Sequence, residues 1–299
     1  MHIEPTSRCV LACPGCPRTW FSEKFNRPFP KHDLDLDALE RFLDCESGKS
    51  VRSFLLSGNH GDPIYYPRLI EMVQRFRDRA FKISTNGSYM PEKFWNDLSD
   101  NLTHDDTVYF SLDGLEHDNH LYRRNSDWAS IIAGIKIMAR GPAKVVWKSI
   151  IFSYNQHEQD QMRSMANDLG IEFIAESTGY FGDESLRPTT EQLIRIDLLY
   201  EYSKESKDID PKCHHGKMEF VSADGYYWPC CMISNSQTLY KTQLWKDRQQ
   251  WKLDTQNLDQ ARQKVQFWAE SVKHQGTDAP SPCKMHCKPG QNGYHWPTI

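Results

Sequence analysis

The sequence predicts an α/β fold in which a partial (β/α)6 barrel of parallel strands is followed by a smaller cysteine-rich extension. Up to about residue 185, short apolar runs alternate six times with amphipathic helical stretches, which is typical of parallel strands joined by right-handed crossovers. After residue 189 this alternation stops and cysteines become frequent. We therefore predict a barrel domain in residues 1–188 and a second domain in residues 189–299.

The expected strands are short and rich in β-branched or apolar residues: His2–Thr6, Ser53–Ser57, Phe81–Thr85, Val108–Leu112, Val145–Phe152 and Glu172–Glu176. The helices expected between them are Asp35–Asp44, Arg68–Arg79, Pro91–Leu98, Trp128–Ala139 and Glu158–Leu169. Eight strands close a complete barrel, so six predict an open, TIM-like one. Beyond the barrel we expect a helix over Glu191–Ser203, a hairpin turning at Asp224-Gly225, and a helical stretch over residues 241–273.

Composition excludes several classes of protein. The net charge is only −4 and is spread along the chain, so no general nucleic-acid-binding surface is expected. No run approaches the roughly 20 apolar residues that span a bilayer, and the first residues are unlike a signal peptide. We therefore expect a cytoplasmic protein, in which clustered cysteines bind metal or take part in catalysis. Cys45 stands alone in a helical pattern and is expected to be a small core residue.

The first cysteine group is Cys9, Cys13 and Cys16, with CxxxCxxC spacing. It follows the first strand directly, and sites in parallel α/β folds form at that end of a strand. Three thiolates hold three corners of a four-iron cubane and leave the fourth iron open to a small molecule. A zinc site is the alternative, although zinc usually adds a second CxxC pair or histidines.

The first group also carries a family resemblance, because the segment IEPTSRCVLACPGCPR (Ile3–Arg18) resembles the opening of radical S-adenosylmethionine (SAM) proteins. LSGNHGDP at the second strand resembles that family's Gly-Gly-Glu-Pro region, with Asp62 in place of the usual Glu. Ser84–Gly87, Ser111–Gly114 and the following HLYRR (His120–Arg124) resemble further motifs at successive strand ends. The resemblance implies a [4Fe–4S] cluster on Cys9, Cys13 and Cys16. It also implies SAM contacts from Gly58, Asn59, Gly61, Asp62, Pro63, Thr85, Asn86 and Asp113.

The second cysteine group lies in the last third of the chain. Cys213 and Cys230 follow the pattern CX11GX4C, and Cys283 and Cys287 form CxxxC. This resembles the SPASM extension, or its shortened twitch form, which carries auxiliary Fe–S clusters. The resemblance implies one auxiliary [4Fe–4S] cluster held by these four cysteines, with Cys231 as an alternative to Cys230. A zinc ribbon that uses His214, His215 or His286 is the competing interpretation.

The resemblance implies reductive cleavage of SAM and a 5′-deoxyadenosyl radical, with an electron donor such as a flavodoxin or ferredoxin. Our leading hypothesis is an enzyme that abstracts a hydrogen from a peptide or protein side chain. A second is the same chemistry on a small molecule, nucleotide or sugar, and a third is a zinc-stabilised binding protein without catalysis. Asn155 is a candidate contact for cofactor or substrate, and the candidate substrate contacts are Arg123, Arg124 and Tyr180.

Overall fold

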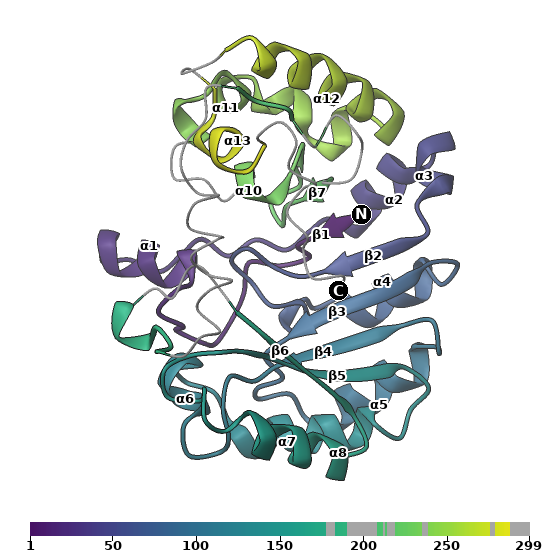
Figure 1. Cartoon of the computed structure of the whole chain (residues 1–299). Coiled ribbons are helices and arrows are strands. Elements are labelled where there is room, and N and C mark those ends of the chain that lie inside the picture. The colour runs from purple at the N-terminus through teal and green to yellow at the C-terminus, as the bar shows by residue number, and fades with distance from the viewer. Residues whose placement is uncertain are drawn as a thin grey trace.

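The computed structural model describes residues 1–177, 183–189, 208–211, 213, 219–234, 239–275 and 279–287. Its centre is one open sheet with the strand order β6-β5-β4-β3-β2-β1-β7-β8 (Figure 1). Strands β1 to β6 pair in parallel with their neighbours, and only β7 and β8 pair antiparallel. The predicted partial barrel of six parallel strands is therefore confirmed.

The first six strands lie where the sequence places them, within two residues at most ends. They are β1 (His2–Ile3), β2 (Ser53–Leu56), β3 (Ala80–Thr85), β4 (Thr107–Ser111), β5 (Lys144–Ile150) and β6 (Glu172–Glu176). The largest difference is β1, which ends three residues before the expected Thr6. Beyond Ile3 the chain turns away from β2 and lies beside another segment, where Thr6 forms an isolated bridge with Asp33.

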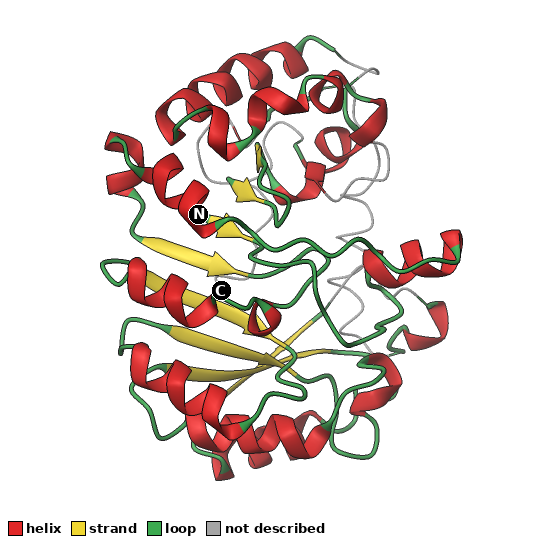
Figure 2. Cartoon of the chain, turned by 180° about the vertical axis from the view of Figure 1, so that it is seen from behind, coloured by secondary structure: helices red, strands yellow, loops and turns green. Residues whose placement is uncertain are grey.

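Helices cover one side of the sheet (Figure 2). The barrel helices are α1 (Pro17–Phe25), α2 (Leu36–Leu43), α3 (Glu46–Ser50), α4 (Leu69–Arg75), α5 (Glu92–Asn101), α6 (Asn119–Tyr122), α7 (Trp128–Met138) and α8 (Gln159–Asp168). Short 3-10 turns follow β2 as η1 (Pro63–Tyr65) and β6 as η2 (Glu184–Leu186). Helix α1 begins directly after the cysteine motif, with Pro17 at its first position, where the missing N–H costs nothing.

Local sequence explains why the helices dock as they do. The Asp35 carboxylate caps α2 by accepting hydrogen bonds from the N–H groups of Asp37 and Ala38. Leu39 and Phe42 recur on one face of α2 and are fully buried. Between sheet and helices lies an aromatic core whose largest buried members are Trp95, Trp147, Phe42, Phe54, Phe81 and Phe110. This packing fixes the strand ends that carry the site.

The C-terminal part of the chain joins the same sheet. Strand β7 (Phe220–Val221) pairs in parallel with β1, and β8 (Tyr227–Trp228) forms the predicted hairpin with β7. Gly225 in the turn has φ of 81°, a conformation that favours glycine. The remaining elements are α10 (Cys231–Ser234), η5 (Leu239–Lys241), α11 (Gln243–Lys246), η6 (Arg248–Trp251), η7 (Leu253–Thr255), α12 (Leu258–Lys273) and α13 (Ser281–His286). The helix expected over Glu191–Ser203 lies outside the described residues, and the domain boundary at residue 188 stays a prediction.

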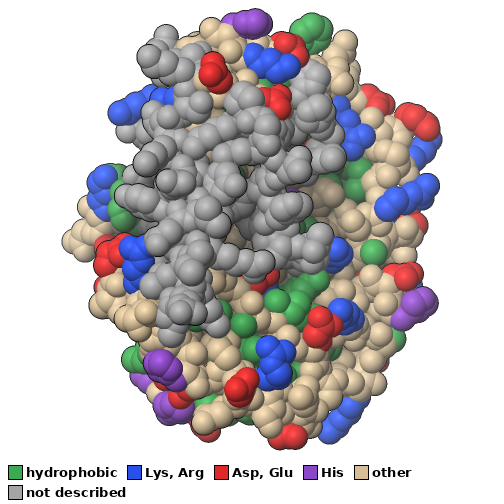
Figure 3. All heavy atoms as spheres, viewed as in Figure 1, with side chains coloured by type: hydrophobic (Ala, Val, Ile, Leu, Met, Phe, Trp, Pro, Cys, Tyr) green, Lys and Arg blue, Asp and Glu red, His purple; other side chains and the backbone are tan. Residues whose placement is uncertain are grey.

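Among the described residues, no helix is long and apolar enough to cross a membrane. On the face shown in Figure 3, acidic and basic side chains are interspersed over the described surface rather than gathered by sign. Cys45 is half-buried at the start of α3 and packs against the core, as expected for a small hydrophobic residue.

His2 ties β1 to both neighbouring strands. Its ring lies edge-on to Phe220, with centroids 4.7 Å apart, and its Nε2 donates to the Ser57 carbonyl at 2.6 Å. Burial lowers the pKa of His2 from 6.5 to about 4, against smaller opposing effects of the Ser57 carbonyl and Glu4. The folded protein therefore holds this ring neutral at a pH where the unfolded chain already binds a proton.

We expect the free energy of unfolding to fall as the pH drops below 6.5, by about 1.4 kcal/mol at about pH 5.5 from His2 alone. The His2→Gln variant keeps an N–H donor but cannot titrate in this range. Urea unfolding of both proteins at about pH 7.5 and 5.5 measures the difference. Wild type should lose its advantage over the variant at the lower pH, and equal pH dependence in both would contradict this role of His2.

Candidate active site

The three N-terminal cysteines converge on one cavity of about 270 Å³, which we call the cysteine pocket. Cys9, Cys13 and Cys16 lie on the loop between β1 and α1 and all line it. Cys16 stands at the start of α1 without using its side chain as a cap. The Asn86 side-chain N–H groups lie 3.6 Å from the Cys9 sulfur. The structure thus brings the predicted cluster ligands together.

The surroundings of these thiols suit an anionic metal cluster. Burial, with a smaller contribution from Asp62, raises the pKa of Cys9 to about 12. Burial also raises the pKa of Cys13, although the nearby Arg123 opposes that rise. The thiols of Cys9 and Cys13 are therefore neutral without metal, and metal binding has to displace their protons. Arg18 and Arg123 supply the positive charge that favours thiolates once the cluster is bound.

The loop after β2 forms a second wall of the pocket and is held from β1. The Glu4 carboxylate, 2% exposed, accepts hydrogen bonds from the N–H groups of His60 at 2.6 Å and Gly61 at 3.0 Å. A Cβ at Gly61 would clash with the Thr6 carbonyl group, and one at Gly58 with the carbonyl group of Gly61. The close approach of these backbone groups leaves no room for a side chain, which explains why glycine occupies both positions.

Asp62 connects the β2 loop to the end of β3. Its buried carboxylate accepts from the Asn86 backbone N–H at 2.6 Å, from the Asn86 side chain, and from the Ile64 N–H at 3.2 Å. Burial raises the pKa of Asp62, although these hydrogen bonds oppose the rise. The acidic residue that replaces the family's Glu therefore joins two loops of the pocket.

Six of the residues predicted to contact SAM line the cysteine pocket: Gly58, Asn59, Gly61, Asp62, Thr85 and Asn86. Pro63 starts η1 next to Asp62 and is buried. Asp113 and Asn155 are fully buried and lie behind the pocket wall, where the Asn155 side chain donates to the Asp113 carbonyl at 2.7 Å. Their geometry supports a role in holding the wall, and contact of each of these residues with SAM stays a prediction.

Arg123 is the predicted substrate residue that reaches the pocket. Its Nε donates to the buried Asp113 carboxylate at 2.6 Å, and it lies near Cys13. Although burial opposes it, the charges of Asp113 and Cys13 raise the pKa of Arg123, so the guanidinium stays positive. Arg124 is exposed, and its backbone carbonyl accepts from the Ala12 N–H of the cysteine loop at 3.0 Å. Tyr180 lies outside the described residues.

Sequence reasoning missed two functional parts of the pocket. Glu4 lies within an expected strand, so the sequence does not indicate that its buried carboxylate holds the β2 loop. His60 sits in the β2 loop, where its ring stacks on Phe29 with centroids 4.4 Å apart. Tyr122 also lines the pocket, and the HLYRR motif gave a signal for it because Tyr122 directly precedes Arg123.

Asn59 connects this pocket to the C-terminal cysteines. Its side-chain N–H groups donate to the Cys231 carbonyl at 3.1 Å and to the Ser234 hydroxyl at 2.9 Å, both in α10. Helix α10 begins immediately after Cys230. Asn59, which is predicted to contact SAM, is therefore hydrogen-bonded to α10, the helix that directly follows the predicted auxiliary ligand Cys230.

The four predicted auxiliary ligands lie near one another. Burial and the neighbouring thiols, first Cys231 and then Cys213 and Cys287, raise the pKa of Cys230 well above its usual value. A hydrogen bond with Cys287 and burial raise the pKa of Cys283, with further contributions from Cys230 and Cys213. The pKa of Cys231, about 12, is raised by burial, while only hydrogen bonds from its own backbone region act against it. The choice between Cys230 and Cys231 as the auxiliary ligand stays a prediction.

The described cysteines do not form a compact group of three ligand atoms. Zinc binds sulfur at ≈ 2.3 Å, so four tetrahedral thiolates lie about 3.8 Å from one another. Among the described residues, one set of three His, Cys, Asp or Glu side chains has its ligand atoms within 4.8 Å of one another. This set is His117, Asp118 and Glu158, and it contains no cysteine. His214 and His215, which the zinc interpretation would use, lie outside the described residues, and the auxiliary Fe–S cluster stays a prediction.

Comparison with known proteins now decides the family. A model described as the radical SAM superfamily matches residues 3–168, more than half of the chain. The chain belongs to the radical SAM superfamily. Its cofactors are accordingly SAM and a [4Fe–4S] cluster.

A curated relative and several solved structures resemble this radical SAM protein. The relative is the tungsten-containing aldehyde ferredoxin oxidoreductase cofactor-modifying protein of Pyrococcus furiosus, 30% identical over 117 residues. The match covers 38% of this chain and only 31% of the relative's length. AdoMet-bound anSMEcpe has a TM-score of 0.58 and 15% identity, over 98% of this chain and 92% of that one. Streptococcus suis SuiB with its precursor peptide SuiA has a TM-score of 0.56 and 13% identity, over 89% and 66%. At such identities these structures show a shared fold.

Proposed function

We propose that this radical SAM protein abstracts a hydrogen atom from a side chain of a peptide or protein substrate. The observation that carries the proposal is the convergence of Cys9, Cys13 and Cys16 with the β2 and β3 loops on one pocket. A cluster held by these thiolates and SAM bound beside it supply the 5′-deoxyadenosyl radical. The chain's own residues hold these groups in place and keep water away from them.

Each wall of the cysteine pocket has a task in this proposal. The β2 loop, fixed by Glu4 and Asp62, presents backbone groups for the methionine part of SAM. Asn86 donates toward the Cys9 sulfur, which stabilises its thiolate. The Arg123 guanidinium keeps positive charge beside Cys13 and the pocket, where it favours thiolate ligands and carboxylate groups.

A second cavity of about 270 Å³, which we call the aromatic pocket, adjoins the first and supports a side chain as the substrate. His60 lines both cavities. Rings from the barrel, including Phe29, and from the C-terminal part, including Trp228 and Trp245, form its walls. Those two indoles stack in parallel with centroids 6.5 Å apart. Apolar and aromatic walls suit one side chain of a larger substrate.

We further propose that Cys213, Cys230, Cys283 and Cys287 hold an auxiliary [4Fe–4S] cluster. Their mutual proximity, with Cys283 hydrogen-bonded to Cys287, supports it. Such a cluster would supply an acceptor for the electron that the substrate radical loses when it is oxidised, so that hydrogen abstraction could end in net dehydrogenation or a new cross-link. The solved relative SuiB, crystallised with its precursor peptide, is consistent with a peptide substrate.

The Pyrococcus furiosus relative favours a second candidate, because its name describes modification of a cofactor. On that hypothesis the aromatic pocket takes a small molecule. The local similarity extends over only 38% of this chain, while the fold similarity to anSMEcpe covers 98% of it. We therefore place the peptide substrate first.

Reduced protein incubated anaerobically with SAM tests these two candidates. One set of reactions receives short peptides that span the common side chains, and the other receives small cofactors and nucleotides. We expect a peptide to raise the release of 5′-deoxyadenosine above the substrate-free rate, together with a mass change in that peptide. Stimulation by a small molecule alone would replace the first candidate with the second.

A further inference from the structure

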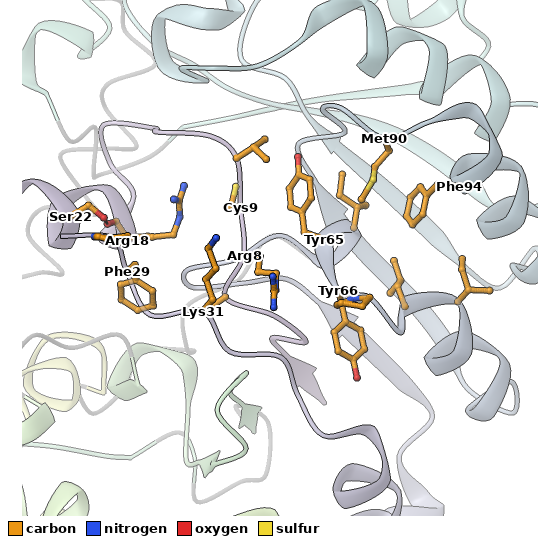
Figure 4. Close-up of a pocket in the computed structure, with 17 residues that line it drawn as sticks. Arg8, Cys9, Arg18, Ser22, Phe29, Lys31, Tyr65, Tyr66, Met90 and Phe94 are labelled. Atoms are coloured by element: carbon orange, nitrogen blue, oxygen red, sulfur yellow. Dashed lines mark hydrogen bonds between the residues drawn. The ribbon is translucent and has the colours of Figure 1, made fainter.

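A larger cavity also reaches Cys9. It has a volume of about 570 Å³, and we call it the basic cavity (Figure 4). Of the described residues that line this cavity and the cysteine pocket, Cys9 alone belongs to both. The same thiol therefore faces the inner pocket and a cavity on the surface.

The two walls of the basic cavity differ in character. On the side of α1 and the loop after it stand Arg8, Arg18 and Lys31, and Tyr65 and Met90 belong to the opposite wall (Figure 4). Arg8 is neutralised by Asp33, to which it donates at 2.7 to 3.0 Å. Arg18 donates to the Leu11 carbonyl, but its buried Nε has no hydrogen-bond partner. Lys31 is exposed.

The segment that forms this wall is basic in an acidic protein. Residues 8–32 contain five cations (Arg8, Arg18, Lys24, Arg27 and Lys31) and one acid, Glu23, while the whole chain has a net charge of −4. Apart from Arg8, none of these cations forms an ion pair with a described acidic residue. Lys24, Arg27 and Lys31 are exposed, with Lys24 over the Trp20 ring at 4.5 Å and Arg27 over the Phe21 ring at 5.3 Å. Exposed local charge of this kind steers proteins of opposite sign.

Exposed apolar side chains lie on the cavity wall and on the segments that contribute to its lining. Val10, which lines the cavity, is 40% exposed. Phe25 at the end of α1 is 49% exposed, and Tyr89, which precedes the lining residue Met90, is 54% exposed. These are three of the five strongly exposed large hydrophobic residues in the described structure. Apolar contacts inside a charged rim are the anatomy of a protein–protein interface.

We propose that the surface around the basic cavity is the docking site of a small acidic electron-transfer protein, of the flavodoxin or ferredoxin kind. The proposal rests on the proposed function, which needs one electron for each cleavage of SAM. The reduced donor loses one electron, the cluster gains it in passing from the 2+ to the 1+ state, and no bond forms between the proteins. Cys9 is the point at which the docked donor comes nearest to the cluster.

The test uses anaerobically reconstituted protein and an acidic bacterial flavodoxin as the probe. Two quantities are measured at low salt: the Kd for oxidised flavodoxin by biolayer interferometry, and the rate at which reduced flavodoxin bleaches the cluster absorbance near ~400 nm. The Lys24→Glu/Lys31→Glu variant reverses two exposed charges. Lys136→Glu reverses an exposed charge on α7 as the matched control, and Lys31→Arg preserves the charge.

We expect the double variant to raise the Kd and slow the bleaching by about tenfold at low salt, with little difference at about 0.5 M salt. Lys136→Glu and Lys31→Arg should behave as wild type, and dithionite should bleach all four proteins equally. Wild-type binding that does not weaken with salt, or a double variant that binds as tightly as wild type, would overturn the docking site. Absence of any cluster that dithionite can bleach would instead overturn the proposed function.

Discussion

Replacing Cys9, Cys13 and Cys16 together with alanine is expected to abolish release of 5′-deoxyadenosine and to halve the iron content. The wild-type protein should hold about eight irons, and the triple variant about four, from two four-iron clusters of which one is lost. The physical reason is that these three thiols line the pocket that the β2 and β3 loops complete. Iron and sulfide analysis of anaerobic protein, with mass spectrometry of the SAM products, measures both effects.

Cys45→Ala is the matched control for the triple variant, because Cys45 is half-buried at the start of α3 and lines none of the three cavities described above. It should keep its iron and its SAM cleavage. If the triple variant still cleaves SAM, the N-terminal thiols do not hold the cluster. A wild-type protein with only four irons would remove the auxiliary cluster and leave the first one in place.

The second large effect separates two adjacent cysteines. Cys230→Ala should lose about four irons, whereas Cys231→Ala should keep about eight. The Cys230 thiol has the thiols of Cys213, Cys283 and Cys287 in its surroundings, while Cys231 is buried within α10. Loss of the auxiliary cluster should also lower thermal stability, because the metal joins residues far apart in sequence.

Cys231→Ala serves as the control for Cys230→Ala, because each variant removes one thiol and the two positions are adjacent. Cys283→Ala should repeat the iron loss of Cys230→Ala from the other end of the site. The remaining cluster in each variant should still respond to SAM in its electron paramagnetic resonance spectrum. Iron loss in Cys231→Ala with full iron in Cys230→Ala would exchange the roles of the two residues.

The barrel could be predicted from sequence because its signals are local. Strands such as Ala80–Thr85 are short apolar runs, and helices such as Leu36–Leu43 carry a cap and one buried face. The cysteine positions at the end of β1 were predictable for the same reason. Local signals do not predict the length of β1, because its length depends on pairing with β2 and β7, and both of these strands pair with His2 and Ile3 alone.

The rest of the site depends on contacts between distant residues. Glu4 could not be recognised as a support of the β2 loop, because its partners at His60 and Gly61 are more than fifty residues away. Asn59 was expected beside SAM, and its bonds to α10 cross more than 170 residues. The sequence also does not show that Arg8, Arg18 and Lys31 line one cavity with Cys9, which depends on the fold.

Strand β1 has consequences for the order in which the molecule assembles. It consists of only His2 and Ile3, and its partners are β2, about fifty residues later, and β7 at Phe220–Val221. During synthesis the earliest strand therefore waits for one of the latest, which makes its pairing slow and entropically costly. Strand β1, which precedes the cysteine loop, is therefore paired on both sides only after β7 has been made.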